Sequence, residues 1–185
     1  CMECIVTTDE GVDLLPANVK YAMMELEISS AMSREHLLNE FVVMQRPFYD
    51  FILIDCPPNV GLFVLNALTA SDSVLIPVKL EDLSIDGLQQ LIQTIGIAKR
   101  RLNYNLEIEG ILFTIVETNT VLARNSIEAI REAYGEHVHI YDFVIPKSVK
   151  AAECPGSGTS IYKYDPNGKV AKAYEVLTKE VLSNV

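Results

Sequence analysis

Short apolar runs alternate with longer amphipathic stretches along this chain, and this alternation most constrains what it can fold into. The apolar runs have the length and the β-branched and aromatic content of strands; they lie at 50–55, 73–78, 108–116 and 138–146. Between them, the segments near 61–70, 84–102 and 122–134 repeat apolar residues at helical spacing. Strands that alternate with helices predict an α/β fold with a mostly parallel sheet flanked by helices.

The two ends of the chain carry further elements of the same kinds. The pattern predicts a short strand at 11–18 that ends at Pro16, and then a helical segment over 19–45. That segment is expected to break at "SAMSRE", where Ser33 can cap a second helix. Toward the other end, the Gly, Ser and Pro content of 146–160 predicts a loop, and 169–182 predicts a final helix. No internal repeat is present, so residues 1–185 are expected to form one domain.

The helix at 84–102 has a clear apolar face. Ser84 can cap its first turn, and three basic residues, Lys99, Arg100 and Arg101, follow near its end, where the helix dipole favours cations. The residues expected to be buried on this helix are Leu88, Leu91, Ile92, Ile95 and Ile97.

The amino-acid composition narrows the classes of protein to which this chain can belong. Hydrophobic residues make up 49% of the 185 and charged residues 22%, as in ordinary globular domains. No apolar run approaches the ~18–20 residues that span a bilayer, and no signal-peptide pattern is present. We therefore expect no membrane partner and a cytoplasmic location. The net charge of −10 argues against a general nucleic-acid coat, although a local basic patch remains compatible with it.

The cysteines are few and scattered, which suits reduced thiols; they are Cys1, Cys4, Cys56 and Cys154. Cys1 and Cys4 have a C-x-x-C spacing but no second pair or nearby histidine, so we expect no metal held by Cys or His. Because the chain begins with Cys and not Met, we expect it to be a piece of a longer product or an excised domain.

The stretch "YDFILIDCPPNVG", residues 49–61, carries the clearest chemistry. Its apolar run predicts a buried strand that ends on Asp55, and ligands of open α/β sheets sit beyond such strand ends. A carboxylate there can hold Mg²⁺, directly or through a water, beside the phosphates of a nucleotide. Pro57 and Pro58 then force the chain out of the sheet, and Gly61 permits a tight entry into the next helix. An ordinary aspartate before a proline turn fits the spacing equally well.

Several segments together resemble the ParA/Soj/MinD-type partition ATPases, especially those of plasmids and mobile elements. The strongest match is "YDFILIDCPPNVGLFVLNALTASDSVLIPV"; "LEIEGILFTIV", "IPKSVKAAECPGSGTSIYKYDP" and "GKVAKAYEVLTKEV" follow in the same order. The resemblance covers nearly all residues. It implies a P-loop NTPase fold of the deviant Walker A type that uses ATP and Mg²⁺. It also implies an ATP-dependent homodimer, nonspecific DNA binding, a ParB-like partner and association with the nucleoid.

The resemblance also assigns roles to particular residues. Asp55 corresponds to the Walker B acid, which contacts Mg²⁺ through a water, and the switch II loop comprises Cys56, Pro57, Pro58 and Gly61. Pro146 and Lys147 fall where the family contacts the adenine base, although a strand that simply ends at a proline explains them equally well. Lys147 and Lys150 fall where the family has DNA-binding arginines, whereas Asn119 replaces another such arginine. Lys99, Arg100 and Arg101 are further candidates for a DNA contact.

One part of the family's site has no match in these residues. We find neither the Walker A loop that binds the phosphates, with its glycines, two lysines and a threonine, nor the switch I aspartate that follows it. The pair Gly168-Lys169 is followed by Val170, where the Walker A pattern requires Ser or Thr. We therefore expect an N-terminally truncated ATPase domain that binds no nucleotide tightly and hydrolyses no ATP by itself, and that is marginally stable or oligomeric. The alternative is a non-catalytic interaction module that pairs with a full-length ParA-like or ParB-like partner. A MinD-like membrane role is a weaker third reading, because "KAYEVLTKEVLSNV" lacks a basic, strongly hydrophobic face.

Overall fold

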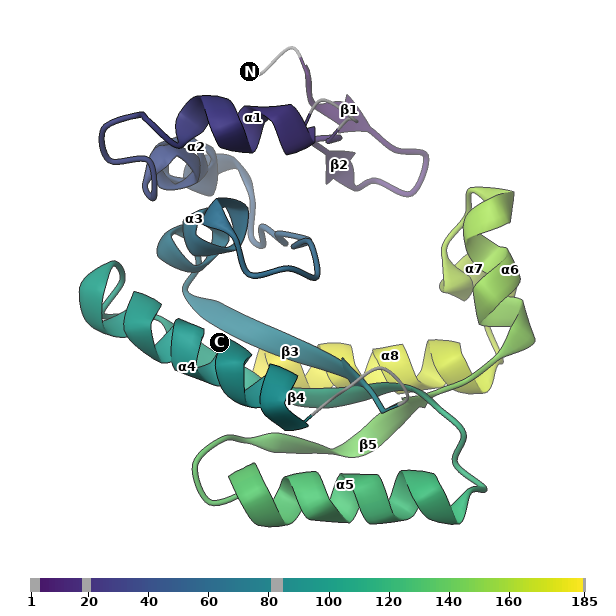
Figure 1. Ribbon diagram of the computed structural model, residues 1–185. Coiled ribbons are helices and arrows are strands. Elements are labelled where there is room, and N and C mark those ends of the chain that lie inside the picture. Colours follow the sequence, from purple (N-terminus) through teal and green to yellow (C-terminus); the bar gives the residue numbers. More distant parts are fainter. Residues whose placement is uncertain (1–3, 18–20, 81–84, 185) are drawn as a thin grey trace. The chain divides into compact units, whose positions relative to one another are not determined.

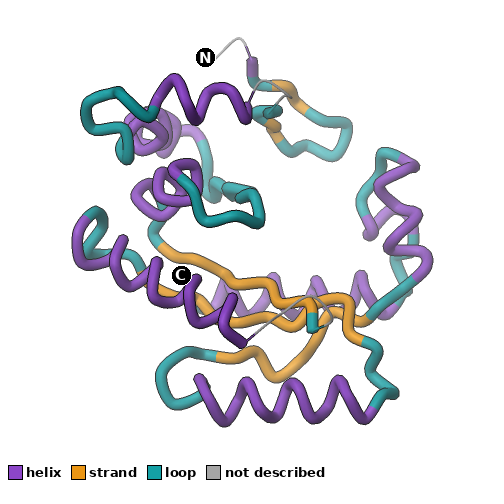
Figure 2. Tube along the Cα trace, viewed as in Figure 1, coloured by secondary structure: helices purple, strands orange, loops and turns teal. Residues whose placement is uncertain are grey.

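The computed structural model describes residues 4–17, 21–80 and 85–184 (Figure 1). The chain divides into two compact units, residues 1–70 and 71–185. Figure 2 shows that the first unit is mostly helical, whereas the second contains the longer strands.

The first unit begins with a small antiparallel hairpin. It pairs β1 (Val6–Thr7) with β2 (Asp13–Leu14), and Gly11 supplies the positive φ of 77° that the connecting turn requires. The Thr7 hydroxyl and the Tyr49 hydroxyl both donate to the Asp13 carboxylate, at 2.6 and 2.8 Å. These hydrogen bonds hold the pKa of Asp13 below its usual range. The strand predicted at 11–18 is therefore real but only two residues long.

Within the described part of this unit the helices are α1 (Tyr21–Ile28), α2 (Leu37–Gln45), the short 3₁₀ helix η2 (Arg46–Phe48) and α3 (Leu62–Ala70). The predicted break at "SAMSRE" is confirmed, because α1 and α2 are separate. The predicted cap is wrong. Ser33 has a positive φ of 53°, and α2 begins after His36 without a side-chain cap. The helix α2 packs against α3.

The buried strand predicted at 50–55 is also wrong. Residues 51–57 have no regular structure, and Leu53 is 93% exposed. An apolar run forms a buried strand only where neighbouring strands accept its hydrogen bonds and cover its faces. Among the described residues of this unit the strands are β1 and β2, of two residues each, so 51–54 remains exposed outside a sheet.

The second unit is built on a parallel sheet, as predicted. Its strands β3 (Ser73–Lys79), β4 (Glu107–Val116) and β5 (Ile140–Pro146) pair in the order β3-β4-β5. Parallel neighbours require long crossovers, and these contain α4 (Ile85–Arg101) and α5 (Val121–Tyr134). Helices flank the sheet (Figure 1). Leu112, Tyr141, Ile145 and Val170 form a buried cluster in which the sheet meets the last helix.

The apolar face of α4 differs from prediction at one position. Leu88 and Ile95 are buried, and Leu91 and Ile92 are half-buried, but Ile97 is 48% exposed and Ala98 is fully buried. Ala98 lies three residues after Ile95 on the same stripe, whereas Ile97 lies off it. Ser84, the predicted cap, lies outside the described residues.

The loop predicted at 146–160 is largely helical. The chain forms α6 (Val149–Ser157), α7 (Ile161–Tyr164) and α8 (Lys169–Ser183). Ser148 caps α6 by accepting from the Ala151 amide, and Gly158, with a φ of 64°, ends it. These two terminal signals prevail over the Gly, Ser and Pro content. No described helix combines the length and the apolar character needed to cross a membrane.

Candidate functional site

The predicted switch loop runs from Asp55 to Gly61 and leads into α3. Asp55 is exposed, and its side chain has no ion pair or hydrogen bond within the described residues. Its carboxylate oxygens are thus available to a hydrated Mg²⁺, a cation that keeps several waters and takes few protein ligands. Pro57 and Pro58 follow directly and contribute no backbone N–H donor to any strand.

Cys56 lies beside that carboxylate, and its surroundings disfavour the thiolate. Cys56 is exposed overall, and its Sγ lies 3.8 Å from the Ile54 carbonyl oxygen. Burial of the thiol and then the negative charge of Asp55 raise the pKa of Cys56. The thiolate, which is the reactive form, is therefore disfavoured.

The far end of the loop is fixed by a residue that sequence reasoning missed. The Leu62 amide, at the first position of α3, donates to Glu25 Oε1 at 2.8 Å. A Cβ atom on Gly61 would lie 2.5 Å from the same oxygen. Gly61 is predicted to ease the entry into α3. The structure gives a different reason for glycine at this position, because it makes room for the Glu25 carboxylate from α1.

A second missed residue, Asn66, lies one turn further into α3 and is 4% exposed. Its Nδ2 donates to the Arg34 carbonyl at 2.8 Å and to the Leu62 carbonyl at 3.0 Å, and its Oδ1 accepts from the Leu38 amide at 3.1 Å. One side chain thus satisfies backbone groups of the α1–α2 connection and of α2. A lone Asn in the apolar text "LFVLNALTA" was the available signal.

The predicted base and DNA residues lie in the second unit, at the carboxyl ends of β4 and β5. Pro146 ends β5 opposite Val116, and the Lys147 amide donates to the Val116 carbonyl at 3.0 Å. The Lys147 ammonium forms an ion pair with Glu117, which holds the pKa of that carboxyl below its usual value. Lys150 pairs with Asp165 at 2.8 Å, which raises the pKa of Lys150. Both lysines are therefore partly neutralised by carboxylates.

Ile115, beside these residues, has an unusual backbone. Its φ is +55°, which is rare for a β-branched residue, and its side chain is 47% exposed. The pairing of β4 with β5 shifts register between Phe113 and Val116, and Ile115 lies inside that shift. Strained backbone tends to occur at functional positions, and here it lies one residue before Val116, the partner of Pro146.

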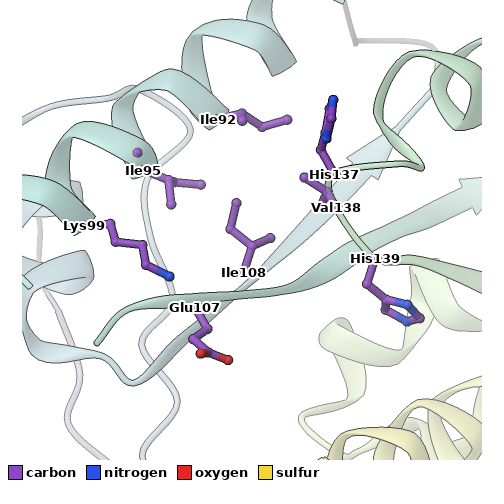
Figure 3. A pocket seen from close by; sticks show the side chains of 9 residues that line it. Ile92, Ile95, Lys99, Glu107, Ile108, His137, Val138 and His139 are labelled. Carbon is purple, nitrogen blue, oxygen red and sulfur yellow. The ribbon is translucent and has the colours of Figure 1, made fainter. Parts of the chain in front are cut away.

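A pocket of about 400 Å³ lies at the amino ends of the strands, the end of the sheet opposite to Pro146 and Lys147 (Figure 3). Its lining includes Glu107 and Ile108 at the start of β4, Val138 and His139 just before β5, and Lys99 on α4. Figure 3 shows the ring of His139 turned away from the isoleucines, and its Nε2 lies 3.1 Å from Glu180 Oε1. Ligands of open α/β sheets bind at the carboxyl ends of strands. This pocket lies at the amino ends, and Lys99, one of the further DNA candidates, is the predicted residue among those that line it.

The structure gathers most of the predicted residues into two groups, one in each unit, while the further DNA candidates Lys99, Arg100 and Arg101 lie in the last turn of α4. Asp55, Cys56, Pro57, Pro58 and Gly61 share one loop of the first unit. Pro146, Lys147 and Lys150 lie together where β5 leads into α6 of the second unit.

Comparisons with known proteins give the class of the fold. A family model described as an AAA domain matches residues 1–108. A solved structure named cobyrinic acid a,c-diamide synthase, from Mycobacterium smegmatis with a bound ATP analog and magnesium, is 29% identical. It superposes with a TM-score of 0.80 over 94% of this chain and 63% of that one. A plasmid partition protein from Borrelia burgdorferi, 20% identical with a TM-score of 0.70 over 99% of this chain and 67% of that one, shares the fold. The fold is that of the P-loop ATPases.

Relatives that are similar in sequence show which family of P-loop ATPases the chain belongs to. The sporulation initiation inhibitor protein Soj of Bacillus subtilis is 41% identical over 178 residues, which are 96% of this chain and 70% of that protein. The chromosome partitioning protein ParA of Myxococcus xanthus is 36% identical over 171 residues, 92% of this chain and 60% of that protein. The chain belongs to the ParA/Soj-type family of partition ATPases, and it spans 60 to 70% of the length of these two relatives.

Proposed function

We propose that this chain carries the metal-side switch of a partition ATPase that distributes plasmid or chromosomal DNA. The observation that carries the proposal is the exposed Asp55 carboxylate at the head of a proline loop that ends at an anchored helix. In the complete site Asp55 holds Mg²⁺ through a water, and residues 56–61 follow the state of the nucleotide's phosphates.

The 185 residues alone do not hydrolyse ATP in this proposal. Phosphoryl transfer depends on positioning and on electrostatic stabilisation of the phosphates. Their sequence contains no G-x-x-x-x-G-K-[ST] loop to supply those groups. ATP and Mg²⁺ are therefore cofactors of the complete site and do not bind tightly to this polypeptide by itself.

The second unit carries the residues that we assign to the nucleotide base. Pro146 and Lys147 lie at the carboxyl ends of the strands, where α/β sheets bind nucleotides. Ile115, whose apolar side chain is exposed, precedes Val116, the residue that pairs with Pro146. The cobyrinic acid a,c-diamide synthase of known structure, 29% identical, has a bound ATP analog and magnesium, which supports these cofactors for the complete protein.

The partners we propose are those of the family: a second copy of the ATPase in the presence of ATP, a ParB-like protein, and nonspecific DNA in the nucleoid. Lys147 and Lys150 would bind DNA only by exchanging the carboxylates of Glu117 and Asp165 for phosphates. Because these ion pairs compete with phosphate and the net charge is −10, we expect DNA binding by this chain to be weak. A cytoplasmic location agrees with these partners.

A second candidate function is a non-catalytic module that pairs with a full-length ParA-like or ParB-like chain. The exposed apolar residues Phe51, Ile52 and Leu53 favour it, because extended apolar backbone outside a sheet can pair with another chain. In this case Leu53→Glu would abolish pairing, whereas Leu122→Glu, at a similarly exposed position on α5, would not.

The gene sequence before the codon for Cys1 separates the two candidates. An in-frame glycine-rich loop with lysines favours the ATPase, and a start codon with no such loop favours the module. Where the loop exists, the complete reading frame is expected to hydrolyse ATP. Asp55→Asn should lower kcat by at least about 10²-fold, while the exposed Asp50→Asn leaves it near the wild-type value. Wild-type turnover in the Asp55→Asn variant would overturn the assigned role.

A further inference from the structure

We propose that Glu25 is a positioning residue that holds the C-terminal end of the switch loop, and that Gly61 is glycine because the Glu25 carboxylate occupies the space beside it. The inference rests on the proposed switch role of residues 55–61. It assigns a structural partner to that loop from α1, a helix that sequence reasoning did not connect with the site.

The first observation is the hydrogen bond from the Leu62 amide to Glu25 Oε1, at 2.8 Å. Leu62 is the first residue of α3, so its amide has no acceptor within the helix. A carboxylate is the favoured partner at this position, because the amino end of a helix carries partial positive charge. Glu25 thus caps α3 from another helix, in place of a capping residue of its own.

The second observation is the space at Gly61. A Cβ there would approach Glu25 Oε1 to 2.5 Å, so any side chain must displace the carboxylate. The described glycines with a positive φ are Gly11, Gly110 and Gly158, and Gly61 is not one of them. Its backbone is therefore open to alanine, and the requirement for glycine comes from the neighbouring carboxylate.

Asn66 completes the attachment of α3. It ties the same helix to the Arg34 carbonyl and to the Leu38 amide. The end of the loop at Gly61 is thus fixed to α1 and to the α1–α2 connection, whereas Asp55 and Pro58 at the other end are exposed.

Amide hydrogen exchange of the 185-residue chain, followed by NMR without nucleotide, tests this inference. The Leu62 amide reports the contact with Glu25, whereas the Leu65 amide, which donates to the Gly61 carbonyl at 3.1 Å, reports the helix itself. In Glu25→Ala we expect protection of Leu62 to fall about tenfold, the size of one lost capping bond, with little change at Leu65. Glu25→Gln keeps an acceptor oxygen, so protection of the Leu62 amide should fall less in this variant. It also serves as the test if the alanine variant fails to fold.

Gly61→Ala provides the independent arm. It should lower protection of Leu62 as Glu25→Ala does, and the double variant should lose no more than either single variant, because both changes remove one contact. The matched controls are Glu27→Ala and Gly156→Ala. Glu27 is an exposed glutamate on the same helix, and a methyl group on Gly156 would meet no other atom within 4 Å.

Three results would overturn the inference. They are unchanged Leu62 protection in Glu25→Ala, additive losses in the double variant, and equal losses at Leu62 and Leu65, which would mean that α3 simply unravels. Because no nucleotide is present, these results are independent of the proposed function. That function fails separately, if ATP and Mg²⁺ leave the amides of Asn59 and Val60 unchanged in a complete protein that binds them.

Discussion

Asp55 and Cys56 are neighbours in the chain, and the charge of the first acts on the thiol of the second. Burial and that charge both raise the pKa of Cys56, burial being the larger cause. We expect Asp55→Asn to lower the pKa of this thiol part of the way toward its ordinary value. Alkylation by iodoacetamide at fixed mildly alkaline pH should then be a few-fold faster, as measured by mass spectrometry of the peptide.

Asp50→Asn is the control for this experiment, because Asp50 is exposed on the same segment and does not contribute to the pKa of Cys56. Equal alkylation rates in the wild type and in Asp55→Asn would show that the Asp55 carboxylate does not face the thiol. The geometry assigned to the head of the loop would then be wrong.

Tyr141 links stability to pH. It is fully buried, its hydroxyl has no hydrogen-bond partner among the described residues, and burial, Glu109 and Glu180 together raise its pKa from 10.0 to about 12. As pH rises above 10.0, the unfolded chain loses this proton before the folded one does. The contribution of the neutral ring to stability is therefore complete below pH 10.0 and is lost progressively up to about pH 12.

Tyr141→Phe should abolish that part of the pH dependence. At neutral pH we expect the variant to be as stable as the wild type or slightly more stable, because the hydroxyl it removes is unpaired. In alkaline buffers the variant should become the more stable of the two, by urea denaturation. Tyr104→Phe, at a position 77% exposed, is the control. A difference between Tyr141→Phe and wild type that does not change with pH would contradict the account.

At the scale of the elements, the contact between β4 and β5 depends on Gly110. A Cβ there would lie 2.8 Å from Cδ2 of His139 and 2.9 Å from Cε2 of Tyr141, and the His139 carbonyl accepts the Ile111 amide at 2.9 Å. We expect Gly110→Ala to push the strands apart and lower the free energy of unfolding by about 1–3 kcal/mol. Gly156→Ala, inside α6 with open space around it, should be neutral or stabilising by about 0.5–1 kcal/mol. Equal urea midpoints for the two variants would contradict this reading.

The elements that sequence reasoning predicted well are those with strong internal periodicity. The strands β3, β4 and β5 and the helices α3, α4, α5 and α8 lie within a few residues of their predicted bounds. Their patterns depend on local spacing, which the sequence displays directly. The segment 51–54 failed because burial of an apolar run depends on neighbouring strands, which its own residues do not encode. The helix α6 was missed because Ser148 and Gly158 act as terminal signals within a composition typical of loops.

The candidate site shows the same limit. The loop was predicted from Asp55, Pro57 and Pro58, which are close in sequence and match a family motif. The residues that hold the loop are distant: Glu25 lies 37 positions before Leu62, and Asn66 lies 32 positions after Arg34. Such contacts arise from the packing of α1, α2 and α3, and no local spacing predicts them.

At the scale of the whole molecule, charge opposes DNA binding. The net charge is −10, and the carboxylate of Glu117 pairs with one of the two lysines predicted to reach DNA. We expect Glu117→Gln to raise the affinity of the chain for nonspecific duplex DNA a few-fold, because it removes a carboxylate from Lys147. Fluorescence anisotropy with a labelled duplex at low salt measures this effect.

Glu128→Gln is the matched control, since it changes the net charge equally at an exposed position on α5. A larger gain in Glu117→Gln assigns the effect to Lys147. Equal gains in the two variants would mean that only total charge matters, and Lys147 would lose its assigned role.

The most direct test of the account is calorimetric titration of this 185-residue chain with ATP, in the presence and absence of Mg²⁺. The account holds that the chain carries the metal-side switch without the phosphate-binding loop, so it predicts no saturable heat at high micromolar ATP under either condition. Saturable, Mg²⁺-dependent binding would reveal a phosphate site elsewhere in these residues and would contradict the central claim.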